Sequence, residues 1–136
     1  MRPWLHILYF GLTPILRGCS PACVTTFLAQ VHDPAGITFA VVRTDCDLIA
    51  KDSAVSITAI RDNEQGSTLL LKYDPWTDDL PHVHVGSDDT IFIHVSKASS
   101  VLEQHLTFGS FKVKVTIDKL AYPDRGSTND KAAIGD

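Results

Sequence analysis

Phe111-Lys-Val-Lys-Val-Thr-Ile-Asp118 is the stretch that most clearly indicates the fold of this chain. Apolar and polar side chains alternate along it, and two of the polar positions are lysines. Successive side chains of a β-strand point to opposite faces of a sheet, so one face of this stretch would be buried and the other solvated. The pattern therefore predicts a half-buried strand, because the apolar residues of a helix would recur every three or four positions.

The same period of two extends back along the chain to Gly36. Turn-forming residues separate the apolar runs, as in 33–36 and 62–67. Short strands with short connections favour an all-β fold, a small antiparallel meander that forms a sandwich or a partly open barrel. A helical turn over 101–106 is an alternative for one segment. The alternating apolar positions are Ile37, Phe39, Val41, Val55, Ile57, Ala59, Leu69, Leu71, Tyr73, Val83, Val85, Ile91, Ile93 and Val95.

Residues 1–18 have the layout of an N-terminal signal peptide. Arg2 leads an apolar run over 5–16, which is interrupted by His, Gly, Thr and Pro. The run is shorter than the roughly 20 residues that a membrane-spanning helix needs. Two alternatives are a secretory signal that is cleaved near Ala22 or Ala29, and an N-terminal segment that packs into the fold of a soluble protein.

The end of the apolar run, Leu16-Arg-Gly-Cys19, resembles the lipobox of bacterial lipoproteins. In that motif a leucine stands three residues before the cysteine, a small residue stands directly before it, and the cysteine becomes the lipidated first residue. Leu16, Gly18 and Cys19 match the motif, whereas Arg17 departs from it because that position is usually small and uncharged. The resemblance implies that Cys19 carries lipid and anchors the protein to a membrane on the periplasmic side of the cell envelope.

The chain has three cysteines, an odd number for an exported protein. If Cys19 carries lipid, Cys23 and Cys46 remain and can form a disulfide in an oxidising compartment. The bridge would stabilise the fold by about 3 kcal/mol through the loop that it closes. The alternative is that Cys23 lies in a tether and never meets Cys46. A structural zinc site is disfavoured because the cysteines lack the C-x₂-C spacing.

We expect a tether over 19–32, a β-domain over 33–123 and a disordered tail over 124–136. The net charge of the whole chain is −4, and the signal segment contains two arginines and no acidic residue. The remaining chain is therefore more acidic still. It has no cluster of lysines and arginines, which argues against nucleic acid as a partner and against electrostatic docking on anionic lipid.

Several stretches of the expected β-domain resemble a group of small uncharacterised bacterial lipoproteins. In that group a Ser-Pro-Asp-Gly turn opens the first strand, a cysteine follows, and a second strand comes next. His32 stands in place of the serine, and Asp47 stands where a glycine often follows the cysteine. The group has no agreed activity, so the resemblance implies a fold and a location. The stretches are 33–42, 45–46, 53–57, 87–95, 99–101, 109–115 and 122–123.

His82, His84 and His94 are the candidate metal ligands. A five-residue loop over 86–90 would place His82 opposite His94 and gather all three imidazoles on one face of a hairpin. Three imidazoles from neighbouring strands suit zinc or copper. A four-residue loop would scatter the cluster, and the histidines would then only supply the polar face. The acidic residues that could orient the imidazoles are Asp78, Asp79 and Asp88.

Tyr73 and Trp76 lie in an aromatic and proline-containing segment, which is a candidate contact surface because aromatic residues are enriched at binding hot spots. The alternative is that Trp76 caps one end of the core. The sequence contains no Gly-x-Ser-x-Gly elbow, phosphate-binding loop or dinucleotide fingerprint. We therefore expect no enzymatic activity and no cofactor.

These observations predict a lipoprotein of the bacterial cell envelope that is a non-enzymatic binding or structural module. Its expected contacts are the membrane, through the N-terminal lipid, and an envelope protein. One alternative is a metal-binding protein that uses the three histidines. Others are a small inhibitor-type domain of the envelope, like the small lipoprotein β-barrels that block lysozymes, and a soluble cytosolic β-protein.

Overall fold

The computed structural model describes residues 22–47 and 51–121, and all of its regular structure is β-strand. The all-β prediction is therefore confirmed. The predicted signal segment (1–18), the predicted lipidation site Cys19 and the predicted tail (124–136) lie outside the described residues. The strands are β1 (Cys23–Asp33), β2 (Ile37–Asp47), β3 (Lys51–Arg61), β4 (Thr68–Pro75), β5 (His82–Val85), β6 (Thr90–Gln104), β7 (Thr107–Phe108) and β8 (Phe111–Leu120).

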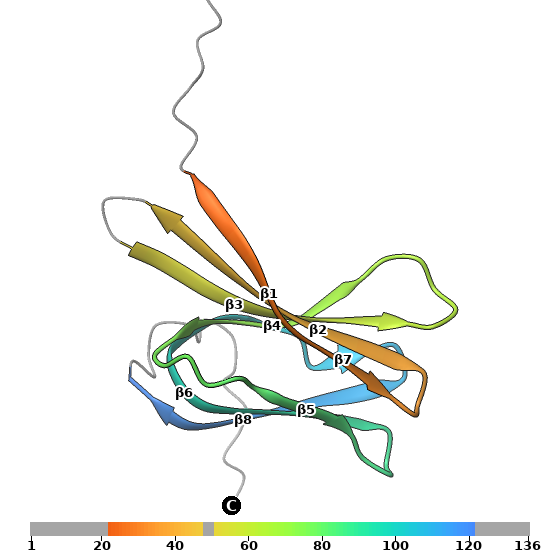
Figure 1. Cartoon of the computed structure of the whole chain (residues 1–136). Coiled ribbons are helices and arrows are strands. Elements are labelled where there is room, and N and C mark those ends of the chain that lie inside the picture. Colours follow the sequence, from red (N-terminus) through yellow and green to blue (C-terminus); the bar gives the residue numbers. More distant parts are fainter. Residues whose placement is uncertain (1–21, 48–50, 122–136) are drawn as a thin grey trace, which may run out of the picture.

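The strands form one continuous sheet that folds over into two layers (Figure 1). The order is β1-β2-β3-β4-β6-β8-β7, and β5 pairs with β6 outside this path. Strands β1 to β4 form one layer, while β5, the first half of β6 and β8 form the other (Figure 1). The described strands do not close into a barrel, so the fold is a sandwich with one shared strand.

Strand β6 passes from one layer to the other. Its first half pairs antiparallel with β5 and parallel with β8, and its second half pairs antiparallel with β4. The register between β4 and β6 shifts twice, and such irregularities bend a strand. The predicted meander is therefore interrupted by one parallel pair. The suggested helical turn over 101–106 is wrong, because 101–104 belong to β6 and pair with β4.

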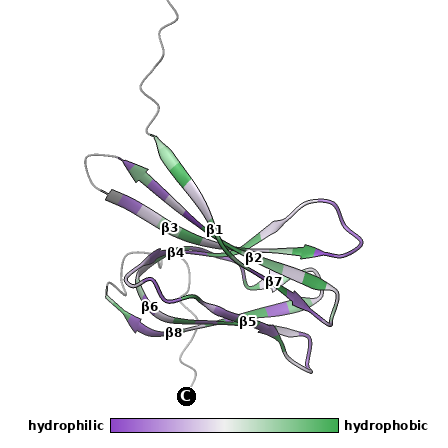
Figure 2. Ribbon diagram, viewed as in Figure 1, coloured by the Kyte–Doolittle hydropathy of each residue, from purple (hydrophilic) through white to green (hydrophobic). Residues whose placement is uncertain are grey.

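The core lies between the two layers and consists of the apolar side chains that alternate along the strands. Figure 2 shows the alternation of hydrophobic and hydrophilic residues along the strands. Burial raises the pKa of Tyr73, which is a core residue with 2% exposure, to about 12. The largest fully buried side chains are Tyr73, Phe39, Ile37, Ile57, Leu70, Leu71, Ile91, Ile93, Val41 and Val95.

The β-domain begins earlier than predicted. Residues 23–33, most of which were expected to form a tether, are strand β1, and they pair with β2 from Cys23 opposite Cys46 to Asp33 opposite Ile37. Leu28 and Ala29 pack against the core from this strand. The tether prediction is wrong here because the mixed threonine and apolar composition of 23–32 lacks the clean alternation of the other strands.

The predicted disulfide is present and joins Cys23 to Cys46. The two residues lie directly opposite each other in the register of β1 and β2, so the bridge fastens the start of the edge strand β1 to the end of β2. It closes a loop with a sequence separation of 23 residues.

Replacing both Cys23 and Cys46 by serine should lower the free energy of unfolding by about 3 kcal/mol, because the unfolded chain regains the conformations that the loop forbids. Urea denaturation followed by tryptophan fluorescence measures the loss. A reductant should destabilise the wild-type protein by a similar amount and leave the double variant unchanged. Equal stability of wild type and variant would show that the bridge adds nothing to the fold.

The free energy of unfolding should also fall at alkaline pH because of Tyr73. Its pKa is about 12 in the fold and about 10 in an unfolded chain, so its contribution is complete below pH 10 and is lost between pH 10 and 12. From pH 9 to pH 11 the loss should be about 1.4 kcal/mol. Tyr73→Phe should lack this component, and parallel urea titrations of the two proteins at both pH values would reveal it. An equal loss of the free energy of unfolding from pH 9 to pH 11 in the wild type and in Tyr73→Phe would contradict the prediction.

Candidate functional site

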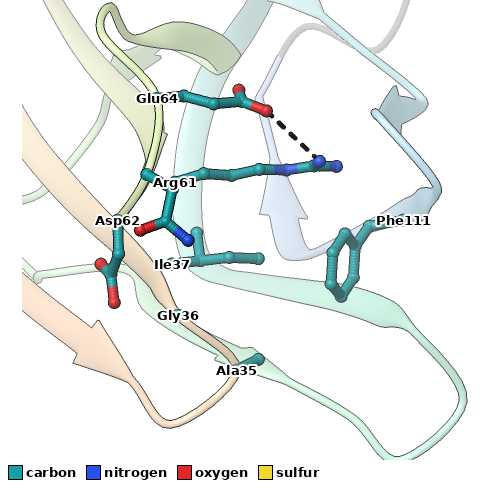
Figure 3. Close-up of a pocket in the computed structure, with 8 residues that line it drawn as sticks. Ala35, Gly36, Ile37, Arg61, Asp62, Glu64 and Phe111 are labelled. Carbon is teal, nitrogen blue, oxygen red and sulfur yellow. Dashed lines mark hydrogen bonds and ion pairs between the residues drawn. The ribbon is translucent and has the colours of Figure 1, made fainter.

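One pocket lies at the end of the sandwich where the β1–β2 turn, the β3–β4 loop and the start of β8 meet (Figure 3). Its volume is about 420 Å³. This is the end opposite the disulfide, because β1 begins at Cys23 and ends at Asp33, just before the turn. We call it the Arg61 pocket, and its lining residues are Ala35, Gly36, Ile37, Arg61, Asp62, Asn63, Glu64 and Phe111.

Arg61 is the last residue of β3 and continues the core-facing phase of that strand. Two residues before it, Ala59 is fully buried, so the guanidinium leaves the sheet on the side of the other layer. Its central carbon lies 5.2 Å from the ring centroid of Phe108 and 5.8 Å from that of Phe111. The ring faces attract the cation, which holds the guanidinium in place at the rim of the core.

The guanidinium reaches one carboxylate of the pocket. Nη1 of Arg61 donates a hydrogen bond to Oε1 of Glu64 at 3.5 Å, which is long for a charged pair (Figure 3). Asp62 points away from the guanidinium in the same view, and its carboxylate lies 3.8 Å from Nδ1 of His32. The pocket therefore offers one cation and one carboxylate side by side, and the side chain of Arg61 is 32% exposed.

Backbone hydrogen bonds fix the floor of the Arg61 pocket. Gly36 has a φ of 78°, and its amide donates to the carbonyl of Asp33 at 3.0 Å. The carbonyl of Gly36 in turn accepts from the amide of Asp62 at 3.0 Å, which joins the turn to the end of β3. The carboxylate of Asp33 accepts from the amide of Ala35 at 2.9 Å and from that of Val85 in β5 at 3.2 Å. Both layers of the sandwich are thus tied together beside the pocket.

Arg61 was not among the candidate residues that the sequence indicated. The signal was present, because a charged residue follows the apolar run of β3 in the phase that faces the core. The aromatic partners could not be foreseen, since Phe108 and Phe111 reach Arg61 only through the parallel pairing of β8 with β6.

The histidine hairpin has the predicted register. His82 lies opposite His94 and His84 opposite Phe92, and the amide of Gly86 donates to the carbonyl of Thr90 at 2.8 Å to close the loop. The side chains have other partners, however. His84 stacks on Phe92 with ring centroids 5.2 Å apart, and Nε2 of His94 lies 2.9 Å from a carboxylate oxygen of Asp118.

Within the residues that the structure describes, no group of three or more His, Cys, Asp or Glu side chains is placed to hold a metal ion. Two of the acidic residues expected beside the histidines have other partners: Asp78 accepts from Arg43, and Asp79 accepts from Thr77 and Ser96. Metal binding by His82, His84 and His94 stays a prediction that the geometry does not support.

A polar network occupies the disulfide end of the sandwich. Arg43 in β2 donates to Asp45 at 3.0 Å and to Asp78 in the β4–β5 loop at 2.6 Å. Ser53 in β3 also donates to Asp45, and this hydrogen bond, followed by that from Arg43, lowers the pKa of Asp45. The network holds the β4–β5 loop against strands β2 and β3.

The two aromatic candidates have different positions. Tyr73 is buried in the core and offers no contact surface, so the binding role suggested for it is wrong. Trp76 is 52% exposed, together with Leu80 at 50% in the same loop, and therefore does not cap the core.

Comparison with protein-family models, with curated proteins and with solved structures gives no match for this chain. In 22–47 and 51–121, no helix is long and apolar enough to span a bilayer.

The Arg61 pocket depends on Gly109, which has a φ of 58°. A Cβ there would overlap Nη2 of Arg61. Gly109→Ala should therefore shift the guanidinium away from the rings of Phe108 and Phe111, and the loss of these contacts adds to the roughly 1–2 kcal/mol of left-handed backbone strain. Gly66→Ala is a comparison without a steric contact, because nothing lies within 4 Å of the added carbon, but its φ of 104° imposes more backbone strain on alanine than the 58° of Gly109.

Urea denaturation of both variants measures the difference. In an Arg61→Ala background, Gly109→Ala should cost only the backbone strain, since the overlapping side chain is gone. An equal cost of Gly109→Ala in both backgrounds would contradict the contact between Gly109 and Arg61.

Proposed function

We propose that this protein is an exported lipoprotein of the bacterial cell envelope and acts there as a non-enzymatic binding module. The observation that carries the proposal is the Cys23–Cys46 disulfide. Structural disulfides persist in oxidising compartments and are rare in the cytosol, so the bridge supports export. It also uses two of the three cysteines and leaves Cys19, the cysteine of the lipobox-like stretch, for lipid.

The proposal gives the domain a defined orientation. Only four residue steps separate Cys19 from Cys23, so a lipid on Cys19 would hold the disulfide end within about 14 Å of the anchoring point. Strand β1 has 11 residues and a length of roughly 35 Å. The Arg61 pocket at the far end of β1 would then face away from the membrane, where a soluble molecule of the envelope can reach it.

Intact-mass measurement of the protein expressed in a bacterium from its own leader tests this proposal. We expect loss of residues 1–18, a gain of mass that corresponds to diacylglycerol-type lipid, and a gain of two hydrogens upon reduction. Cys19→Ser is the matched control and should lose the lipid mass while it keeps the two-hydrogen gain. An unprocessed chain without lipid would refute the lipoprotein assignment.

A further inference from the structure

We infer that the Arg61 pocket binds a small zwitterion of the α-amino acid class, with its carboxylate on Arg61 and its ammonium group on Glu64. The inference rests on the proposed binding role, but it does not depend on the lipid anchor. It follows from three properties of the pocket: the partly paired guanidinium that two rings hold in place, the carboxylate beside it, and the half-buried ring of Phe111.

The guanidinium is held in place but only partly paired. Its side chain is 32% exposed, and the rings of Phe108 and Phe111 fix its position. Among the described residues its hydrogen bond goes from Nη1 to Glu64 at 3.5 Å, and Nη2 lies close to Gly109, so part of its five donors is available. A planar carboxylate fits this fork with two parallel hydrogen bonds, and it would find the donors already positioned.

The acidic groups at the rim select against a simple anion. Glu64 and Asp62 have side-chain exposures of 59% and 46%, and both belong to the lining of the pocket. A phosphate or a dicarboxylate would place two or more negative charges against them, which is unfavourable. A ligand with a positive charge next to its carboxylate matches the order of charges, because Arg61 and Glu64 are neighbours in space.

The wall of the pocket provides an apolar surface for the body of the ligand. This surface is the half-buried ring of Phe111, because Ile37, which also lines the pocket, is only 1% exposed. A volume of about 420 Å³ lies in the range of pockets that bind small molecules. An aliphatic side chain would pack against the ring of Phe111 while the charged groups of the ligand meet Arg61 and Glu64.

Isothermal titration of leucine into the full chain, purified after expression from its own leader, tests the inference. We expect saturable binding with one leucine per protein. Leucinamide lacks the carboxylate and N-acetylleucine lacks the ammonium group, so each should bind at least about tenfold more weakly, as expected for loss of one charged hydrogen-bonded contact. Inorganic phosphate should not compete.

Two variants of the pocket and one control complete the test. Arg61→Gln should abolish leucine binding, and Glu64→Gln should weaken leucine while it strengthens N-acetylleucine. Arg43→Gln lies in the network at the opposite end of the sandwich and should leave both affinities unchanged. If Arg61→Gln fails to fold, as judged by its thermal melt, the exposed Glu64→Gln variant still decides the result.

The inference is overturned if leucine shows no saturable binding or if leucinamide binds as well as leucine. It is also overturned if Glu64→Gln leaves the preference for leucine over N-acetylleucine unchanged. Competition by phosphate would also overturn it and would identify a general anion site. The intact-mass experiment is independent of these results. A lipidated protein that does not bind leucine would retain the lipoprotein assignment and lose the ligand class.

Discussion

The passage of β6 from one layer to the other is the constraint on which the rest of the structure depends. Parallel strands normally need a crossover of a dozen or more residues, usually a helix. Here the crossover between the parallel parts of β6 and β8 is itself a strand, since the second half of β6 pairs with β4 before β7 turns back. The side chains at the bend are small, Ala98, Ser99 and Ser100, and Ala98 is fully buried. One strand therefore supplies both layers and the connection between them.

That return of the chain also creates the Arg61 pocket. The amide of Val113 in β8 donates to the carbonyl of Leu106 at 2.8 Å, so the start of β8 lies beside the segment that precedes it. This turn places Phe108 and Phe111 next to Arg61 at the end of β3. At that point β3 presents Arg61 where its earlier residues present apolar side chains. A charge at the margin of a core is costly unless it is paired or partly solvated. The two rings, Glu64 and the open mouth of the pocket together meet that condition.

The sequence predicts much of this fold because a period of two leaves little freedom once one face is buried. The histidine hairpin shows the logic: Val83 and Val85 can join Ile91 and Ile93 on the buried face in the register that the five-residue loop gives, and the structure has that register. The same logic fails for β1, whose half-polar composition does not mark a buried face, and for β6, whose bulges break the period. Arg61 was missed for a related reason. Its position depends on Phe108 and Phe111, which are distant from it in the sequence and come close to it only in the folded chain.

The two ends of the sandwich are held together by different contacts, and β1 runs from one end to the other. At one end the disulfide fixes β1 to β2, and the Arg43 network ties down the β4–β5 loop. At the other end the carboxylate of Asp33, the last residue of β1, accepts from the turn and from β5 and so joins the layers beside the pocket. An edge strand with one neighbour would fray most easily, yet both of its ends are fastened. A strand that is fixed at both ends acts as a stiff link between them. A constraint on the N-terminal end of β1 would therefore also set the direction in which the Arg61 pocket faces.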